Sequence, residues 1–304
     1  VAAEEIDPET TVSLADWDRY HLPGSNGGAH VAALTDLGIA VDDAGYARDP
    51  AATVTYDQMI WAMIRFSDNA APDYFLDLFG PEVVSAVMAA AGLEPRPLLP
   101  HAGLVLTWQN HEQQVLTAAS LAELSVLERD IYEARVWEMQ TAFLHSEWGE
   151  AERAWRRDNR RPPNPHRLEM AAANRLDNMG TAREFADIMA GVVSGTFLSA
   201  DVSAIMRPHL EWPMAFPGNQ AAFHALGTKG GSLAGLLTEA TYYIPSSGQF
   251  GEQPRVVVLF MREMPFAAWL RLSQTFTQQQ FALEIATNPE FGQQVTAMLN
   301  GGDE

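Results

Sequence analysis

The only lysine of this chain lies in Gly227-Thr228-Lys229-Gly230-Gly231-Ser232-Leu233-Ala234-Gly235. Arginine presents a broad planar fork and lysine a compact point charge, so the two are not interchangeable in a narrow site. Glycines beside the lysine let another backbone or a ligand approach closely. The stretch is therefore either a binding site built around one ammonium group or a glycine-rich hairpin turn with an incidental lysine.

The residues around this stretch have the composition of β-strands. Strands are predicted at 222–227, 238–244 and 255–261, because apolar, β-branched and aromatic residues gather there. The run 256–260 is continuously apolar, which predicts a central strand covered on both faces. Helices are expected to follow at 265–283 and 289–299. The C-terminal part is thus predicted to be an antiparallel sheet with terminal helices.

The best-defined helix of the N-terminal part ends at Ser67-Asp68-Asn69. Thr55 and Gln58 form a capping box at its start, and apolar residues then recur on one face. Two interpretations remain for the end of this helix. Either Ser67 or Asp68 is only the N-cap of the next helix, or Ser67 and Asn69 project polar groups from a rigid corner into a cleft.

The middle of the chain predicts further helices. Ser120 and Glu123 are expected to cap one long helix that continues to about residue 148. The highly charged segment 150–161 is predicted to be a solvated face. Pro162-Pro163-Asn164-Pro165 is the best candidate for an internal linker.

Helices followed by a short antiparallel sheet predict an α+β fold with two lobes. Residues 1–216 are predicted to form a mainly helical lobe, with the Ser-Asp-Asn motif and an extra helical stretch around 111–165. Residues 217–304 are predicted to form the sheet lobe, with the Lys-Gly-Gly motif and the C-terminal helices. A cleft is expected between the Ser67 corner and the strand of Lys229.

Composition narrows the class of partner. The net charge is -20, from 39 acidic and 19 basic residues, which argues against nucleic acids and anionic membranes as partners. A carboxylate-bearing substrate would need a local cation in such a field. The chain has no cysteine, hence no disulfide or thiolate metal site. His111-Glu112 lacks the second histidine of a zinc helix motif, and we predict neither a metal nor a cofactor. No stretch predicts membrane insertion.

The order and spacing of these motifs resemble the serine β-lactamase and DD-peptidase superfamily, in particular the class A β-lactamase-related hydrolases. Ser67-Asp68-Asn69 is followed about 160 residues later by Lys229-Gly230-Gly231 on a strand. The segments 14–20 and 23–30 also look like that class. The likeness covers residues 1 to about 110 and 181–304, whereas the middle helical stretch has no clear counterpart.

The resemblance implies catalytic roles for Ser67, Asn69 and Lys229. Ser67 would relay protons between the nucleophile's lysine and Lys229. Asn69 would hold that lysine and contact the substrate amide. Lys229 would attract the substrate carboxylate, and its ammonium is expected within about 3.5 Å of the Ser67 hydroxyl or one water away.

The resemblance also implies substrate-binding residues. Ser232, through its backbone N–H, would form half of an oxyanion hole, next to Gly231. Tyr20 would be an aromatic gate beside the cleft.

The chain departs from the family's pattern in three places. A Ser-x-x-Lys nucleophile motif is absent, because Leu226 stands three residues before Lys229. Glu112 lies in the right part of the chain for the deacylating Glu-x-x-Leu-Asn motif, but its neighbours do not match. Gly230 replaces the usual hydroxyl residue. We therefore expect the nucleophile to lie upstream of Val1, and this chain alone to be inactive.

Three interpretations stay open. The first is a serine hydrolase that acts on amide or β-lactam bonds of carboxylate-bearing substrates through an acyl-enzyme. The second is an inactive binding or regulatory homologue that holds a carboxylate ligand through Lys229, and the third is a structural domain. The expected partners are a small-molecule or peptide substrate and either an upstream N-terminal segment or another subunit. The resemblance implies export to the periplasm or outside the cell, although the chain begins without a signal peptide.

Overall fold

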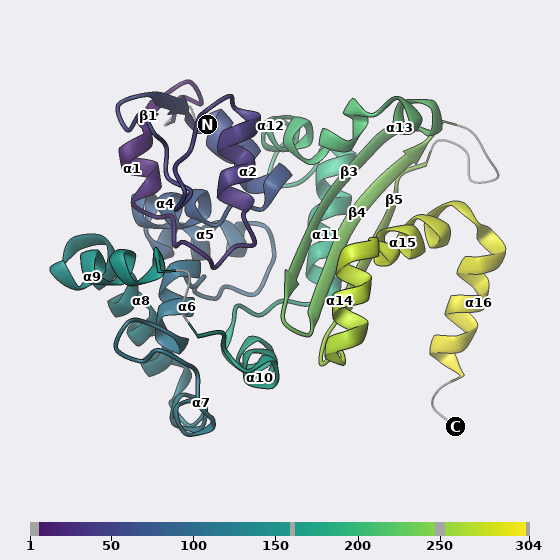
Figure 1. Cartoon of the computed structure of the whole chain (residues 1–304). Helices are drawn as coiled ribbons and strands as arrows, with labels where there is room; N and C mark the ends of the chain where they lie inside the picture. Colours follow the sequence, from purple (N-terminus) through teal and green to yellow (C-terminus); the bar gives the residue numbers. More distant parts are fainter. Residues whose placement is uncertain (1–5, 159–161, 247–252, 302–304) are drawn as a thin grey trace. The chain divides into compact units, whose positions relative to one another are not determined.

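The computed structural model describes residues 6–158, 162–246 and 253–301 (Figure 1). Residues 1–5, the start of the predicted helical lobe, lie outside these ranges. Contacts divide the chain into two compact units, Val1–Asn178 and Met179–Glu304. Helices and an antiparallel sheet are both present, which confirms the predicted α+β class.

The first unit is mainly helical. A two-stranded antiparallel sheet pairs β1 with β2, so that Val12 lies opposite Val54. A buried core of Leu14, Trp17, Leu34 and Met59 joins the sheet to the surrounding helices. The elements of this unit are β1 (Thr11–Ser13), α1 (Leu14–Asp18), α2 (Ala29–Asp36), β2 (Thr53–Thr55), α3 (Tyr56–Trp61), the π-helix η1 (Ala62–Phe66), α4 (Ala70–Phe79), α5 (Pro81–Ala90), α6 (His101–Trp108), α7 (Ala118–Ser125), α8 (Arg129–His145), α9 (Glu147–Arg156) and α10 (His166–Leu176).

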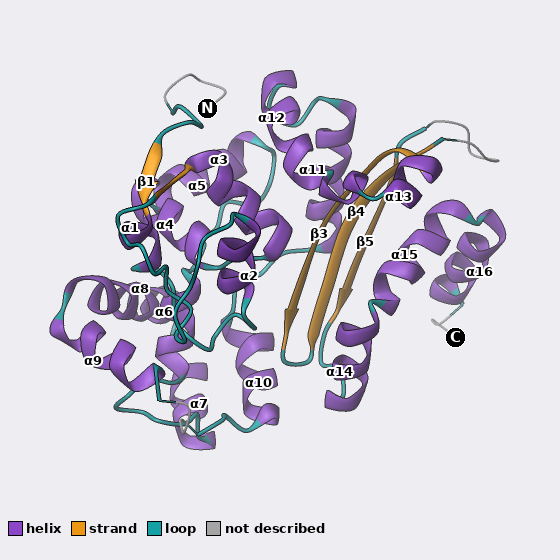
Figure 2. Ribbon diagram, turned by 45° about the horizontal axis from the view of Figure 1, so that its top comes forward, coloured by secondary structure: helices purple, strands orange, loops and turns teal. Residues whose placement is uncertain are grey.

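The second unit is built on three antiparallel strands in the order β3-β4-β5, which lie side by side in Figure 2. These strands confirm the three that the sequence predicts, and β3 is longer than expected. The elements are α11 (Ala182–Ser194), α12 (Ala200–Leu210), the 3-10 helix η2 (Trp212–Ala215), α13 (Pro217–Ala222), β3 (Phe223–Leu233), β4 (Leu236–Pro245), β5 (Arg255–Met261), α14 (Phe266–Thr275), α15 (Thr277–Thr287) and α16 (Pro289–Asn300).

Helices cover both faces of this sheet. Phe260 of β5 packs edge-to-face on Phe185 of α11, and Phe260 lies opposite Thr238 in the register. Glu239, the next residue of β4, accepts a hydrogen bond from Gln279 of α15. Successive strand residues point to opposite faces, so α11 covers one face and α15 the other.

The position of β5 corrects one prediction. Its continuous apolar run predicts a central strand, yet β4 is central and β5 pairs with β4 alone among the described residues. All its residues are half-buried, because α11 and α15 cover its two faces while its outer edge has no paired strand. A continuous apolar run indicates that both faces of a strand are covered, but it does not indicate how many strands pair with it.

The helices after β5 also differ from prediction. One helix is expected at 265–283, but Phe276 adopts a left-handed conformation with φ 52° and separates α14 from α15. The last helix, α16, agrees with the sequence.

The boundary between the two units also differs in position from the predicted one. The contact boundary at residue 178 precedes the predicted boundary at 216, because α11 packs on β4 and β5 and so belongs with the sheet.

The middle of the first unit contains three corrections. The long helix expected from Ser120 is broken, because Thr117 caps α7, which ends at Ser125 before α8 begins. The charged segment 150–161 is not simply solvated, since Glu152 is 0% and Arg156 5% exposed. Asn164 of the predicted linker accepts a hydrogen bond from the Leu116 N–H at 2.7 Å, so 162–165 lies within one unit.

Candidate functional site

The Ser-Asp-Asn motif occupies a tight corner between two helices of the first unit. The capping box of Thr55 and Gln58 starts α3 as predicted. The backbone then widens into η1, and Ser67 ends it in the left-handed region with φ 57°. A non-glycine residue in that region is uncommon and is often found at functional sites.

The three residues of the corner have different surroundings. Ser67 is exposed, Asn69 is half-buried, and Asp68 is only 1% exposed. The Asp68 carboxylate accepts hydrogen bonds from the N–H groups of Ala70 and Ala71, at 3.3 and 2.9 Å. Asp68 therefore caps α4, and the Asn69 side chain makes no capping bond. The corner thus presents a hydroxyl and an amide while the carboxylate between them serves the fold.

Tyr20 belongs to the same unit and packs on α4. Its hydroxyl donates to Asp77 at 2.6 Å, and its ring meets Tyr74 edge-to-face at 5.4 Å. Burial, together with the Asp77 carboxylate, raises the pKa of Tyr20 above its usual range. The ring is half-buried in this arrangement, and its role as a substrate gate stays a prediction.

Lys229 lies within β3 and not in a turn. The chain reverses later, at Ala234 and Gly235, where Gly235 has φ 71°. Lys229 pairs in register with Ala240, which places it on the sheet face that carries Tyr242 and α11. Its side chain is half-buried, and burial lowers the pKa of Lys229 to about 8, although the Glu239 carboxylate acts in the opposite direction.

Glu239 is a buried carboxylate on the opposite sheet face, where it pairs in register with Gly230. The hydroxyls of Thr228 and Thr241 both donate to its Oε1 atom, and Gln279 donates to Oε2 at 3.2 Å. A β-carbon at Gly230 would lie 3.1 Å from Oε2. Glycine at position 230 therefore leaves room for the Glu239 carboxylate. This is a physical reason why glycine stands where the family pattern has a hydroxyl residue.

The other predicted substrate-binding residues continue along β3. Gly231 and Ser232 are exposed and lie opposite Thr238 and Leu237. Ser232 accepts a hydrogen bond from the indole N–H of Trp269 at 3.1 Å. Among the described strands, β3 pairs only with β4, so the residues that follow Lys229 lie on a sheet edge. Such an edge offers backbone groups to an extended ligand.

The sequence reading missed the role of two residues beneath the corner, Asp18 and His30. Both are buried, and His30 bonds to Asp18 and Asp68 at 2.8 and 3.0 Å. Both lie in the segments that carry the family likeness. The sequence signal for this role was a histidine flanked by apolar residues, but the carboxylates that bond to it are distant in the chain.

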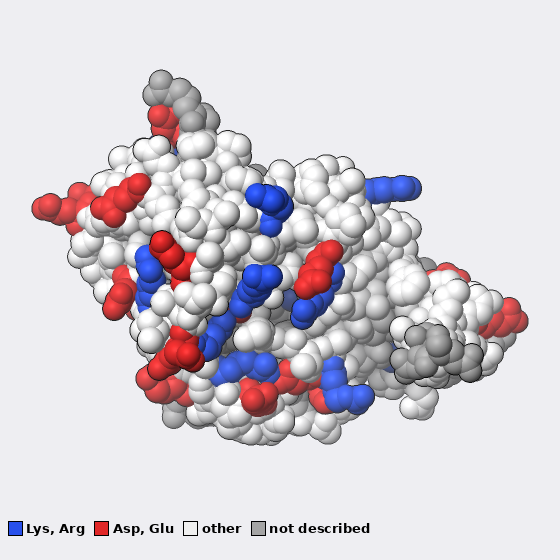
Figure 3. Space-filling view, turned by 90° about the horizontal axis from the view of Figure 1, so that it is seen from below, with Lys and Arg blue, Asp and Glu red and all other residues white. Residues whose placement is uncertain are grey.

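The described residues were also compared with the patterns of metal and membrane sites. Within residues 6–158, 162–246 and 253–301, no three His, Asp or Glu side chains are grouped as metal ligands would be. Helices in these ranges also lack the length and apolar content needed to cross a bilayer. On the face in Figure 3, arginine side chains lie beside acidic ones instead of forming a separate basic patch.

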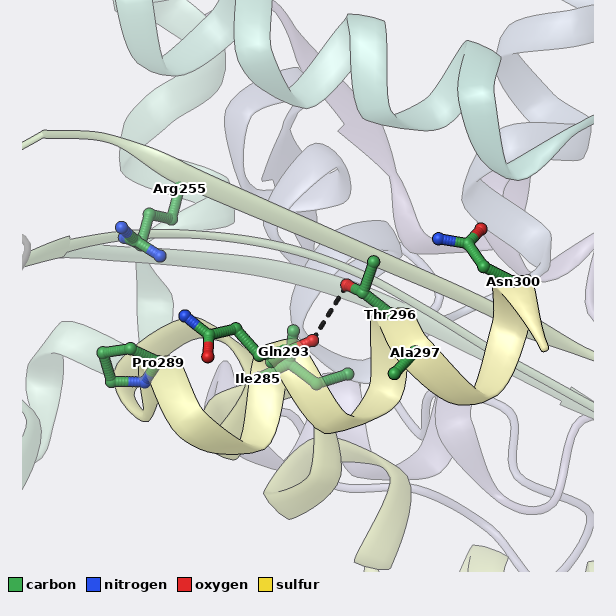
Figure 4. Close-up of a pocket in the computed structure, with 8 residues that line it drawn as sticks. Arg255, Ile285, Pro289, Gln293, Thr296, Ala297 and Asn300 are labelled. Atoms are coloured by element: carbon green, nitrogen blue, oxygen red, sulfur yellow. Dashed lines mark hydrogen bonds between the residues drawn. The ribbon is translucent and has the colours of Figure 1, made fainter.

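One hollow lies apart from the predicted residues. It has a volume of about 560 Å³ and lies in the second unit between β5 and α16 (Figure 4). Arg255, Gln293, Thr296 and Asn300 contribute polar groups to its wall. It contains none of the predicted site residues, and its lining residues are half-buried or exposed.

The Ser-Asp-Asn corner on a helical unit and the Lys-Gly-Gly strand on a sheet unit resemble motifs of the serine β-lactamases. A profile of the β-lactamase enzyme family matches residues 38–241. This match spans more than half of the chain, and the chain belongs to that family. The matched range also runs through the middle helical stretch, for which the sequence reading found no counterpart.

One solved structure to which the chain is similar is that of a β-lactamase from Sphaerobacter thermophilus. The two chains share 15% identity with a TM-score of 0.40, over 86% of this chain and 78% of the other. A comparison with curated protein sequences returns no match.

Proposed function

We propose that this protein is a serine hydrolase of the β-lactamase and DD-peptidase type. Its substrates bear a carboxylate, and the bond cleaved is an amide or β-lactam bond, through an acyl-enzyme. The proposal includes export to the periplasm or the outside of the cell, where substrates of this class occur. Family membership supports the reaction class.

The environment of Lys229 carries the proposal. A half-buried ammonium group followed by two glycines lies on the edge strand of a sheet. Partial burial strengthens its attraction for a carboxylate, because there is less water to screen the charge. The exposed backbone of Gly231 and Ser232 is then within reach of the same ligand.

The Ser67 corner supplies the second part of the proposal. Ser67 would relay a proton and Asn69 would bond to the substrate amide, while Asp68 holds the corner. The two motifs belong to different units, and the proposal requires both to act on one substrate. The single effects of Ser67→Ala and Lys229→Ala on ligand affinity should therefore not add in the double variant.

Calorimetry with a penicillin that has a free carboxylate tests the role of Lys229. Lys229→Ala should weaken binding by about 1.5–3 kcal/mol, the range for hydrogen bonds to charged groups. Lys229→Arg should not restore the affinity fully, because a broad planar guanidinium does not reproduce the compact point charge of an ammonium group. Arg262→Ala is the matched control, since it removes an exposed cation of the same unit. Equal affinities for wild type, Lys229→Ala and Lys229→Arg would contradict the proposal.

Intact-protein mass spectrometry separates hydrolysis from simple binding. We expect no covalent penicillin adduct on these 304 residues alone, because no Ser-x-x-Lys pair is present to activate a serine. A stoichiometric adduct on one of the chain's serines would show that the nucleophile lies within this sequence.

A further inference from the structure

A buried histidine lies between two buried carboxylates directly beneath the Ser-Asp-Asn corner. His30 is 0% exposed, Asp68 1% and Asp18 7%. The Nδ1 atom of His30 lies 3.0 Å from Asp68 Oδ1, and its Nε2 atom lies 2.8 Å from Asp18 Oδ1. Both ring nitrogens must carry a proton to donate to both carboxylates, which only the imidazolium form does.

The surroundings of the ring favour this charged form. Burial alone would lower the pKa of His30, but Asp68 and Asp18 outweigh it and raise the pKa to about 9. His21 stacks on the ring at 4.4 Å, and burial and the His30 charge lower the pKa of His21 to about 4. Trp17 also contacts the His30 ring in an edge-to-face arrangement, with ring centroids 5.0 Å apart.

Each carboxylate also holds a separate backbone segment. Asp68 accepts from the Ala70 and Ala71 N–H groups and so fixes the first turn of α4. The second oxygen of Asp18 accepts from the Ala47 N–H at 2.8 Å. One imidazolium thus joins the end of α1, the start of α2, the loop at Ala47 and the corner that carries Ser67 and Asn69.

We propose that His30 is a positioning residue, whose doubly bonded imidazolium fixes the corner from which Ser67 and Asn69 act. This inference rests on the proposed function, because it takes those two residues as part of the site. A neutral ring keeps one N–H and must leave one carboxylate facing a lone pair. A buried carboxylate without its donor is costly, so the corner shifts when the ring loses its proton.

Backbone-amide NMR against pH tests this inference without any ligand. In the wild type, the amide resonances of Ser67, Asn69, Ala70 and Ala71 should titrate with the His30 ring carbons, with one midpoint near pH 9. In His30→Gln this titration should vanish, and the Ser67 and Asn69 resonances should already be displaced at pH 7. His111→Gln is the matched control, because His111 bonds a single carboxylate, Glu152, at 2.9 Å in the same unit.

A second variant covers the case in which His30→Gln does not fold. Asp18→Asn keeps the bond to Asp68 but removes one carboxylate, and it should shift the common midpoint to lower pH. Corner amides that do not follow the His30 titration would overturn the inference. So would a His30→Gln protein that is less stable but has unchanged Ser67 and Asn69 resonances.

Penicillin affinity, measured on the same proteins, distinguishes a failure of the positioning role of His30 from a failure of the proposed function. Weaker binding by His30→Gln with intact binding by His111→Gln supports the positioning role. If the wild type binds no penicillin while the corner still titrates with His30, the proposed function fails and the inference about the corner stands.

Discussion

The Nδ1 atom of His30 lies 3.0 Å from the Oδ1 atom of Asp68, and both side chains are buried. Burial alone would favour the neutral acid form of Asp68. The His30 imidazolium outweighs this effect and holds the pKa of Asp68 below its usual value. The middle residue of the Ser-Asp-Asn motif is thus fixed from α2, 38 residues earlier in the chain.

The stability of the protein should fall at alkaline pH because of His30. Its folded pKa of about 9 exceeds the ordinary value of 6.5, so the stabilisation is complete below about pH 6.5 and is lost as pH rises through 9. The shift corresponds to about 3 kcal/mol. Chemical unfolding of wild type and His30→Gln between pH 6 and 10 measures it as the difference between the two curves. Parallel curves would contradict the assignment.

Ligand binding should weaken above pH 8 because of Lys229. Burial lowers the pKa of this ammonium to about 8, and the neutral amine that forms at higher pH cannot pair with a carboxylate. Calorimetry with a free-acid penicillin from pH 6 to 10 should show affinity falling through pH 8. The methyl ester of the same penicillin is the control and should show no such decline. An equal pH dependence for acid and ester would exclude Lys229 as the carboxylate anchor.

Gly227→Ala should destabilise the second unit. A β-carbon at this position would overlap the ring of Tyr242, whose hydroxyl donates to Glu211 at 2.9 Å. Overpacking of this kind costs about 1–3 kcal/mol. Gly218→Ala is the control, because nothing lies within 4 Å of the added carbon in α13. Helix propensity predicts that this variant is neutral or more stable by up to about 1 kcal/mol. Thermal unfolding should therefore give a lower midpoint for Gly227→Ala and an equal or higher midpoint for Gly218→Ala, and equal midpoints for Gly227→Ala and the wild type would contradict the predicted overlap.

Arg156→Met should destabilise the first unit much more than Arg129→Met. Both arginines donate Nε–H to a glutamate one turn away at 2.6 Å, but the Arg156 and Glu152 side chains are 1% and 0% exposed. Removal of one partner from a buried pair costs about 3–5 kcal/mol. The Arg129 and Glu133 side chains are 35% and 16% exposed, and such pairs contribute at most about 1 kcal/mol. Denaturant unfolding measures the free energy of unfolding of both variants. Equal losses in Arg156→Met and Arg129→Met would contradict the burial of Glu152.

The corner and the strands could be predicted because their signals are local. Thr55 and Gln58 lie three residues apart, and the apolar period of α3 leads directly to Ser67. The strand composition around Lys229 similarly marks β3 and β4. In each case the hydrogen bonds that form the element join near neighbours or adjacent strands, so the amino-acid pattern is sufficient.

The sequence by itself thus determined the α+β class, the family likeness, and the positions of the Ser-Asp-Asn and Lys-Gly-Gly motifs in the chain. Only the tertiary structure decided that β5 is an edge strand among the described strands, that Glu152 and Arg156 are buried, and that His30 lies between Asp18 and Asp68. Those features depend on partners 4 to 47 residues away in the chain or on neighbouring strands. A charged side chain has the same local sequence signal whether it faces water or a buried partner, and packing alone makes the choice.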